Sequence, residues 1–352
     1  MSETQDSVPL EADDSARTAY RSPAIVGASV ALLGFAFWFA LEKIAATQGA
    51  ASRTAVIDGV FVVLLFLQMG YFISVVPLIR QAGQRCLADL RPMLDGADGQ
   101  LQAVAEQFAR QRIPFVHWAW LAGAVLAGVL QEAQFSRFST WLTSPGPALG
   151  ELWTVLAALG AWSLGLSAAS VLISDAAAIR RLGHDHVAVD LMRVDQLTAF
   201  SRYGLQLTGA VVGLMTLWAV SLVLINAFVG VAWSAKSVYV GLLMVLAYVC
   251  LSIAAFVFPQ LGVRRRIRDK KDAVCDEITS LLPGSGEIMP RTKANPERMA
   301  ALLSSRNEIR AIPEWPAGQH TRIRLTLYLL VPLLSWSAAA LVEEVVSWLL
   351  GG

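Results

Sequence analysis

Long apolar stretches alternate with polar segments along the whole chain. Seven stretches of 17–24 residues are almost entirely apolar, and polar sequence flanks each of them: 23–41, 59–79, 114–130, 152–174, 204–227, 238–258 and 325–342. About 20 apolar residues in a helix cross the roughly 30 Å hydrocarbon layer of a bilayer. The pattern therefore predicts an all-α protein, a polytopic membrane bundle of seven transmembrane helices.

The basic residues predict which side of the membrane each polar segment faces. The N-terminus and the segments after the second, fourth and sixth stretches together hold 24 of the 28 Lys and Arg residues. Because basic segments stay on the cytoplasmic side, we expect the N-terminus inside, the C-terminus outside, and a place in the inner (plasma) membrane. Residues 1–21 carry five acids against two arginines, so we expect an uncleaved, disordered cytoplasmic N-terminus. Residues 22–352 then form one membrane domain.

Three of the inner segments are amphipathic at helical spacing: 80–112, 175–203 and 261–323. We expect helices to project from the membrane in each segment and to return, so that together they build a cytoplasmic helical layer. In the third segment, Asn295 followed by Pro296 predicts a short helix that ends near Ala311. A Pro-bounded turn, IPEWPAGQH, then leads into the last span.

The last apolar stretch has a mixed stripe at helical spacing. It is free of charge from Leu325 to Val342, and Pro332, near its middle, is a predicted hinge. We predict that one stripe, which mixes hydroxyl, acidic and leucine side chains, lines a pore: Thr326, Leu330, Leu333, Ser337, Leu341 and Glu344. A helix that faces only lipid has no use for these polar groups. The alternative for the two acids that follow Val342 is a place among headgroups or in water.

A run of basic residues follows the sixth stretch directly. It consists of Arg264, Arg265, Arg266, Arg268, Lys270 and Lys271. Two interpretations of this run stay open: a site for anionic lipid headgroups, and a topology determinant that touches lipid only incidentally. Neither interpretation implies nucleic acid as a partner.

Metal and thiol chemistry have few candidates. His184, Asp185, His186 and Asp190 form the one cluster with metal-ligand chemistry, but the two histidines point about 200° apart on a helix. We therefore expect a solvated loop without a metal. The three cysteines are an odd number, with one in an apolar stretch, and we expect no disulfide.

Enzyme motifs and buried charges are both missing from the sequence. It has no Walker loop, no HExxH, and no Ser/His or Asp/Asp pair at membrane depth. The middles of the apolar stretches hold no Asp, Glu, Lys or Arg, whereas coupled carriers bury such groups along their pathway. We therefore expect no enzyme, no coupled pump and no cofactor.

Two resemblances extend these predictions. The stretches VDLMRVDQLTAFSRYGLQL, FPQLGVRRRIRDKK and EIRAIPEWP with LYLLVPLLSW resemble a family of uncharacterised multi-spanning membrane proteins of prokaryotes, which implies no function. In architecture the chain is similar to the seven-transmembrane ion channel superfamily that includes insect odorant and gustatory receptors. This second resemblance implies a homotetramer in which inner helix extensions and a short helix form an anchor layer and the last span lines the pore.

Together these predictions give a hypothesis for the function. We expect a passive, cation-permeable channel in the bilayer, homo-oligomeric with a tetramer favoured, and a small-molecule ligand stays open. Hydroxyls of the stripe would replace part of an ion's hydration, its leucines would form dewetting constrictions, and Glu344 would concentrate cations. Two alternatives stay open: a non-conducting membrane scaffold or sensor, and a carrier of a small neutral solute.

Overall fold

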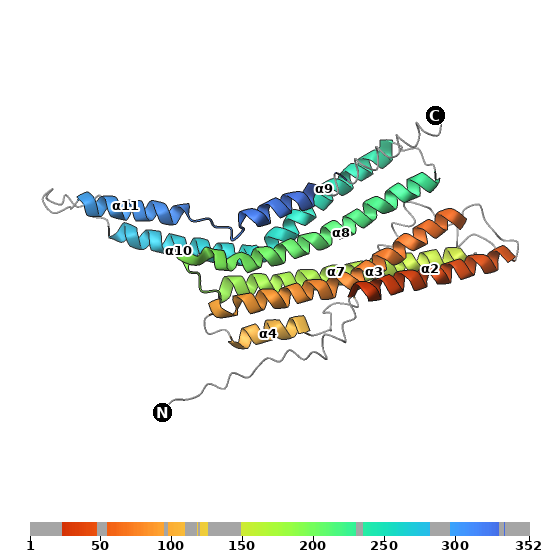
Figure 1. Cartoon of the computed structure of the whole chain (residues 1–352), viewed down its shortest axis with the longest axis horizontal. Coiled ribbons are helices and arrows are strands. Elements are labelled where there is room, and N and C mark those ends of the chain that lie inside the picture. Colours follow the sequence, from red (N-terminus) through yellow and green to blue (C-terminus); the bar gives the residue numbers. More distant parts are fainter. Residues whose placement is uncertain are drawn as a thin grey trace, which may run out of the picture. The chain divides into compact units, whose positions relative to one another are not determined.

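The fold is all-helical in the residues that the computed structural model describes, which are 23–47, 55–94, 98–109, 118, 120–125, 149–229, 235–281, 296–330 and 334 (Figure 1). Within these ranges the backbone forms one isolated antiparallel β-bridge, between Leu94 and Val187. The prediction of an all-α protein is confirmed.

Among the described residues the named α-helices are α2 (Pro23–Thr47), α3 (Ala55–Leu90), α4 (Asp98–Ala109), α7 (Leu149–Asp185), α8 (Thr198–Val229), α9 (Ala235–Val257), α10 (Leu261–Ser280) and α11 (Pro296–Ala311). Short 3₁₀ turns join some of them: η1 (Arg91–Met93), η2 (Leu191–Leu197) and η3 (Phe258–Gln260). Residues 319–330 are also helical, and we call them the last helix.

In the part of the chain that the structure describes, three helical segments are long and apolar enough to cross a membrane: Val62–Met93, Val155–Asp185 and Val245–Ser280. A shorter apolar helix covers Ile25–Ala40. Many large apolar side chains on these segments are exposed on the chain's own surface, including Leu33 and Ile173. The chain is therefore a helical membrane protein. Most of the predicted third stretch, 114–130, lies outside the described residues.

The helices divide into two compact units, Met1–Leu78 with Trp120–Ala168, and Ile79–Ala119 with Ala169–Gly352. In the first unit, apolar side chains of α2, α3 and α7 form one core: Ala31, Trp38, Val62, Leu65, Phe66, Ala157, Ala158 and Ala161. Gly27 and Gly70 lie so close together that a Cβ on either would collide with the other's backbone. Glycine at both positions therefore lets α2 and α3 cross at short distance.

In the second unit, α8 and α9 lie side by side (Figure 1). The Thr208 hydroxyl contacts the carbonyl of Gly204 in its own helix at 3.0 Å and that of Ser252 in α9 at 3.2 Å. Pro259 lacks an amide hydrogen, and the chain passes through η3 at this residue before it continues as α10. The contact between Thr208 and Ser252 thus joins α8 to α9 about two helical turns before α10 begins.

The predicted inner segments are mostly helical where they are described, with non-helical residues at 186–190 and 312–318. α3 runs on to Leu90 and is followed by α4, and α7 runs on to Asp185. The short helix predicted to end near Ala311 is confirmed as α11, which begins at Pro296. α11 lies beside α10 (Figure 1). A proline at the first helical position costs no hydrogen bond, so this start was readable from the sequence.

Candidate functional site

The connector, which we define as residues 312–318, joins α11 to the last helix. Side chains from α8 and α10 contact it directly, and Gln260 of η3 bonds to one of these side chains. We call these four residues the connector clamp: Ser201, Gln260, Arg264 and Lys271. The connector is the direct route from α10 and α11 to the predicted pore helix.

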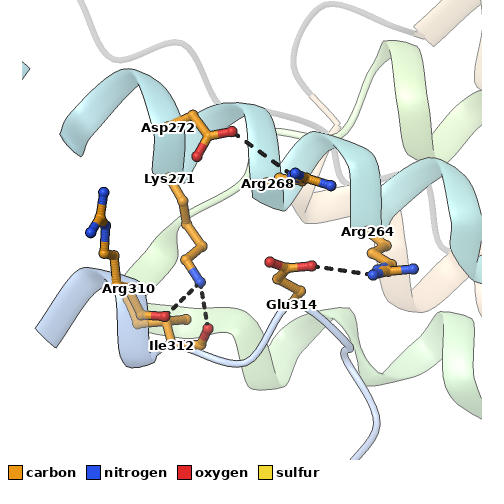
Figure 2. A network of polar contacts seen from close by, with 7 residues as sticks. All are labelled: Arg264, Arg268, Lys271, Asp272, Arg310, Ile312 and Glu314. Carbon is orange, nitrogen blue, oxygen red and sulfur yellow. Dashed lines mark hydrogen bonds and ion pairs between the residues drawn. The ribbon is translucent and has the colours of Figure 1, made fainter. Parts of the chain in front are cut away.

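Lys271 of α10 caps the end of α11. Its Nζ donates hydrogen bonds to the carbonyls of Arg310 at 2.9 Å and Ile312 at 2.8 Å (Figure 2). The last carbonyls of a helix lack intrahelical donors and lie at the negative end of the helix dipole. The side chain is 7% exposed, so these bonds form with little competition from water. A neighbouring helix thus supplies the cation that the end of α11 requires.

Arg264 holds the middle of the connector. Its Nη2 lies 3.5 Å from Oε2 of Glu314, and its guanidinium carbon lies 4.4 Å from the centre of the Trp315 ring. The carboxylate contact is drawn in Figure 2. A planar guanidinium can stack on an aromatic face and pair with a carboxylate at the same time. All three side chains are half-buried, so we assign this part of the clamp a smaller stabilisation than that of Lys271.

Ser201 and Gln260 hold the end of the connector in a fully buried position. The Ser201 hydroxyl lies 2.7 Å from the Pro316 carbonyl and 2.9 Å from Oε1 of Gln260. Nε2 of Gln260 donates to the Phe256 carbonyl at 2.7 Å. Because the hydroxyl has one proton, it donates to one of its two acceptors at a time. The start of α8 therefore fixes Pro316 of the connector, and η3 acts on it only through the Ser201 hydroxyl.

The last helix has one packed face and one exposed face. The Tyr248 hydroxyl of α9 donates to the Tyr328 carbonyl at 3.1 Å, and the Tyr328 ring lies against Gly209 of α8. On other sides, Thr326 and Leu330 of the predicted stripe are exposed. The Thr326 hydroxyl donates back to the Arg322 carbonyl at 3.1 Å. The remaining predicted residues, Leu333, Ser337, Leu341, Glu344 and the hinge Pro332, lie outside the described residues.

The basic run divides into residues exposed on the surface and residues that face the connector. Arg265, Arg266, Arg268 and Lys270 are exposed, and Nε of Arg268 lies 3.9 Å from Oδ2 of Asp272 (Figure 2). Arg264 and Lys271 instead face the connector. Lys271 is one of the six candidates for lipid headgroups, but in this structure its ammonium is buried and bound to two carbonyls. The headgroup interpretation of the run stays a prediction.

A signal for Lys271 was present in the sequence. Buried α10 residues recur at every fourth position: Val263, Ile267, Lys271 and Cys275. A lysine in an apolar stripe at helical spacing faces the protein, whatever the charge of its neighbours in the sequence. By composition alone, all six basic residues of the run are equivalent. The helical period distinguishes the buried Lys271 from its exposed neighbours.

A second buried polar group holds α3 to α7 in the second unit. Nε of Arg80 lies 3.2 Å from Oδ2 of Asp175, with side chains 13% and 2% exposed. Among the described residues the buried Tyr203 hydroxyl has no hydrogen-bond partner, and the Phe108 ring meets the Tyr203 ring edge-on with centroids 6.4 Å apart. Burial raises the pKa of the Tyr203 phenol well above its ordinary range. This arrangement was not predicted, because the sequence does not show that residues 95 positions apart form a pair.

The predicted histidine cluster lies at the end of α7. His184 Nδ1 and Asp185 Oδ1 form a hydrogen bond, and His186 lies in the turn that follows. Over the ranges that the structure describes, no group of three or more His, Cys, Asp or Glu side chains could hold a metal ion. The Asp190 carboxylate accepts a hydrogen bond from the Met192 amide at 2.9 Å and caps η2. Asp190 thus has a local structural role.

Comparison of the chain with models of known protein families, with curated proteins and with solved structures found no match. Both predicted resemblances stay predictions.

Proposed function

We propose that this protein is a passive, cation-permeable ion channel, a homo-oligomer with a tetramer favoured. In this proposal the chain spans the inner membrane seven times with its N-terminus inside, and the last helix lines the pore. One observation carries the proposal: the last helix is held on one face by Tyr248, while Thr326 and Leu330 stay uncovered on another. A pore helix at a symmetry axis needs both a fixed and an uncovered face.

The connector clamp supports the same proposal. A channel must transmit a change in its inner part to the helix that lines its pore. The clamp binds the connector next to the first residues of the last helix. Inner helices and the pore helix are thereby joined by a short, well-bonded segment.

Cation flux through reconstituted liposomes tests the proposal. A Cys250→Ser background removes an exposed thiol, and single cysteines at Thr326 and Leu327 then form a matched pair, because both positions are exposed and adjacent. Neighbouring positions on a helix point about 100° apart. A charged, water-soluble thiol reagent is expected to block flux through Thr326→Cys and to leave Leu327→Cys unchanged. Flux no greater than in empty liposomes, or equal block of both variants, contradicts the proposal.

A second candidate is a non-conducting membrane scaffold or sensor. It is favoured by the large apolar side chains that surround Thr326 on the exposed surface, Ile323, Leu327 and Leu334, because such side chains suit lipid. A monomer in native mass spectrometry without cation flux would support this candidate over the channel.

A further inference from the structure

An exposed group of four arginines lies where α7 and α10 meet. We call it the arginine collar, and it consists of Arg180 and Arg181 of α7 with Arg265 and Arg266 of α10. All four side chains are exposed, in contrast to Arg264 and Lys271, which face the connector.

The packing of α7 on α10 brings the two arginine pairs together. Gly262, near the start of α10, lies directly against the Arg180 carbonyl and close to the amide nitrogen of His184. Arg265 and Arg266 follow Gly262 by three and four positions, so they lie on the same side of α10 as that contact. The guanidinium of Arg180 lies 5.1 Å from the centre of the Phe258 ring, which holds it beside the end of α9.

The charge of the collar is mostly uncompensated. Asp185 is an acidic neighbour within electrostatic range of Arg266, and its carboxylate also binds His184. Asp269, three and four positions after Arg266 and Arg265, is a second exposed acid on that side of α10. Four guanidinium groups against these two carboxylates leave a net positive surface. Guanidinium groups bind phosphate oxygens in a two-pronged geometry, which suits them to phosphate esters more than to single carboxylates.

The position of the collar along the helices selects the source of the phosphate. The apolar stretches end at residues 174 and 258, so the four collar positions lie about 9–12 Å beyond these ends at 1.5 Å rise per residue. The headgroup region extends about 5–8 Å beyond the hydrocarbon on each side. Long arginine side chains reach back over such a gap. We infer that the arginine collar binds the phosphate of an anionic phospholipid headgroup.

This inference does not depend on conduction. A scaffold with the same two helices would bind the same lipid, and a channel without the collar would still conduct. Failure of the lipid test therefore leaves the proposed function standing, and the reverse also holds.

Native mass spectrometry of the full-length protein in detergent tests the collar. The protein is titrated with phosphatidylglycerol or with phosphatidylcholine of identical acyl chains, and the ratio of their dissociation constants for the first bound lipid is measured. Because a basic residue near an anionic surface contributes about 1 kcal/mol, each arginine removed is expected to lower this selectivity about five-fold. We expect the effect in Arg180→Gln/Arg181→Gln and also in Arg265→Gln/Arg266→Gln, the second of which leaves the Phe258 contact intact.

The matched control removes two exposed arginines of α11, Arg298 and Arg310. The Arg298→Gln/Arg310→Gln variant is expected to keep the selectivity of the wild type. Equal loss in this control would show a general effect of charge and would overturn the inference, as would unchanged selectivity in both collar variants. Glycerol phosphate in solution is expected not to displace the lipid. Displacement at matched concentration would assign the collar to a soluble anion and would likewise overturn the inference.

Discussion

Replacing Lys271 by methionine tests the connector clamp most directly. The substitution keeps the apolar stem and removes the ammonium that donates to the Arg310 and Ile312 carbonyls at 2.9 and 2.8 Å. Each hydrogen bond from a charged donor contributes about 1.5–3 kcal/mol. Burying the ammonium costs desolvation free energy, and the substitution removes this cost as well, which offsets part of the lost hydrogen-bond energy. We therefore expect the free energy of local opening at the end of α11 to fall by about 3 kcal/mol.

Hydrogen–deuterium exchange measures this opening. Amides in the last turn of α11 and in the connector exchange through local opening, so about 3 kcal/mol corresponds to an approximately 100-fold loss of protection. Lys270→Met is the matched control, because Lys270 is the adjacent lysine and is exposed. The reasoning is refuted if Lys271→Met leaves protection of residues 308–318 unchanged, or if Lys270→Met lowers it equally.

Three further substitutions test other contacts by denaturation in detergent. Ser201→Ala deprives the Pro316 carbonyl of a buried donor, and we expect a loss of about 1–3 kcal/mol in the free energy of unfolding; an unchanged midpoint would remove this residue from the clamp. Gly262→Val places a branched side chain against a facing backbone carbonyl of α7 and is expected to cost about 3 kcal/mol. The same change at Gly318, which has open space around it, is expected to cost less than about 0.5 kcal/mol, and equal costs would contradict the packing. Tyr203→Phe removes a buried hydroxyl that has no hydrogen-bond partner among the described residues, and we expect the free energy of unfolding to stay the same or to rise. Because burial raises the pKa of this phenol, the unfolded chain ionises first above about pH 10. Wild-type stability therefore falls there more than that of the variant, and parallel pH profiles would count against this explanation.

Features that depend on local chemistry could be predicted from the sequence. The helical class follows from the length and apolarity of the stretches, and the start of α11 follows from a proline that is acceptable at a first helical position. The continuation of α3 and α7 beyond their apolar stretches follows from amphipathic periodicity. Each of these features is decided by residues within one or two helical turns.

Features that depend on long-range pairing could not be predicted. Nothing near Arg80 in the sequence indicates that its partner is Asp175, and nothing near Ser201 indicates Pro316. Lys271 is an intermediate case: its place on the buried stripe of α10 was readable, but its two carbonyl partners lie about 40 residues away. Of the predicted pore stripe, Thr326 and Leu330 are exposed as a pore lining requires, and their role stays a prediction.

The spacing of the contacts along the connector has a mechanical consequence. Bonds fix the chain at residues 310, 312, 314, 315 and 316, so no more than one unfixed residue separates neighbouring contacts. A segment held this closely cannot absorb a displacement by bending between its contacts. Ala317 and Gly318 then remain before the helical residues, and the Thr321 amide already donates to the Gly318 carbonyl at 3.0 Å. The last contact from α10 is at Trp315, and Ser201 of α8 holds Pro316. A shift of α10 together with the start of α8 therefore reaches the last helix through only Ala317 and Gly318, and a rotation of the last helix relative to both must be taken up there.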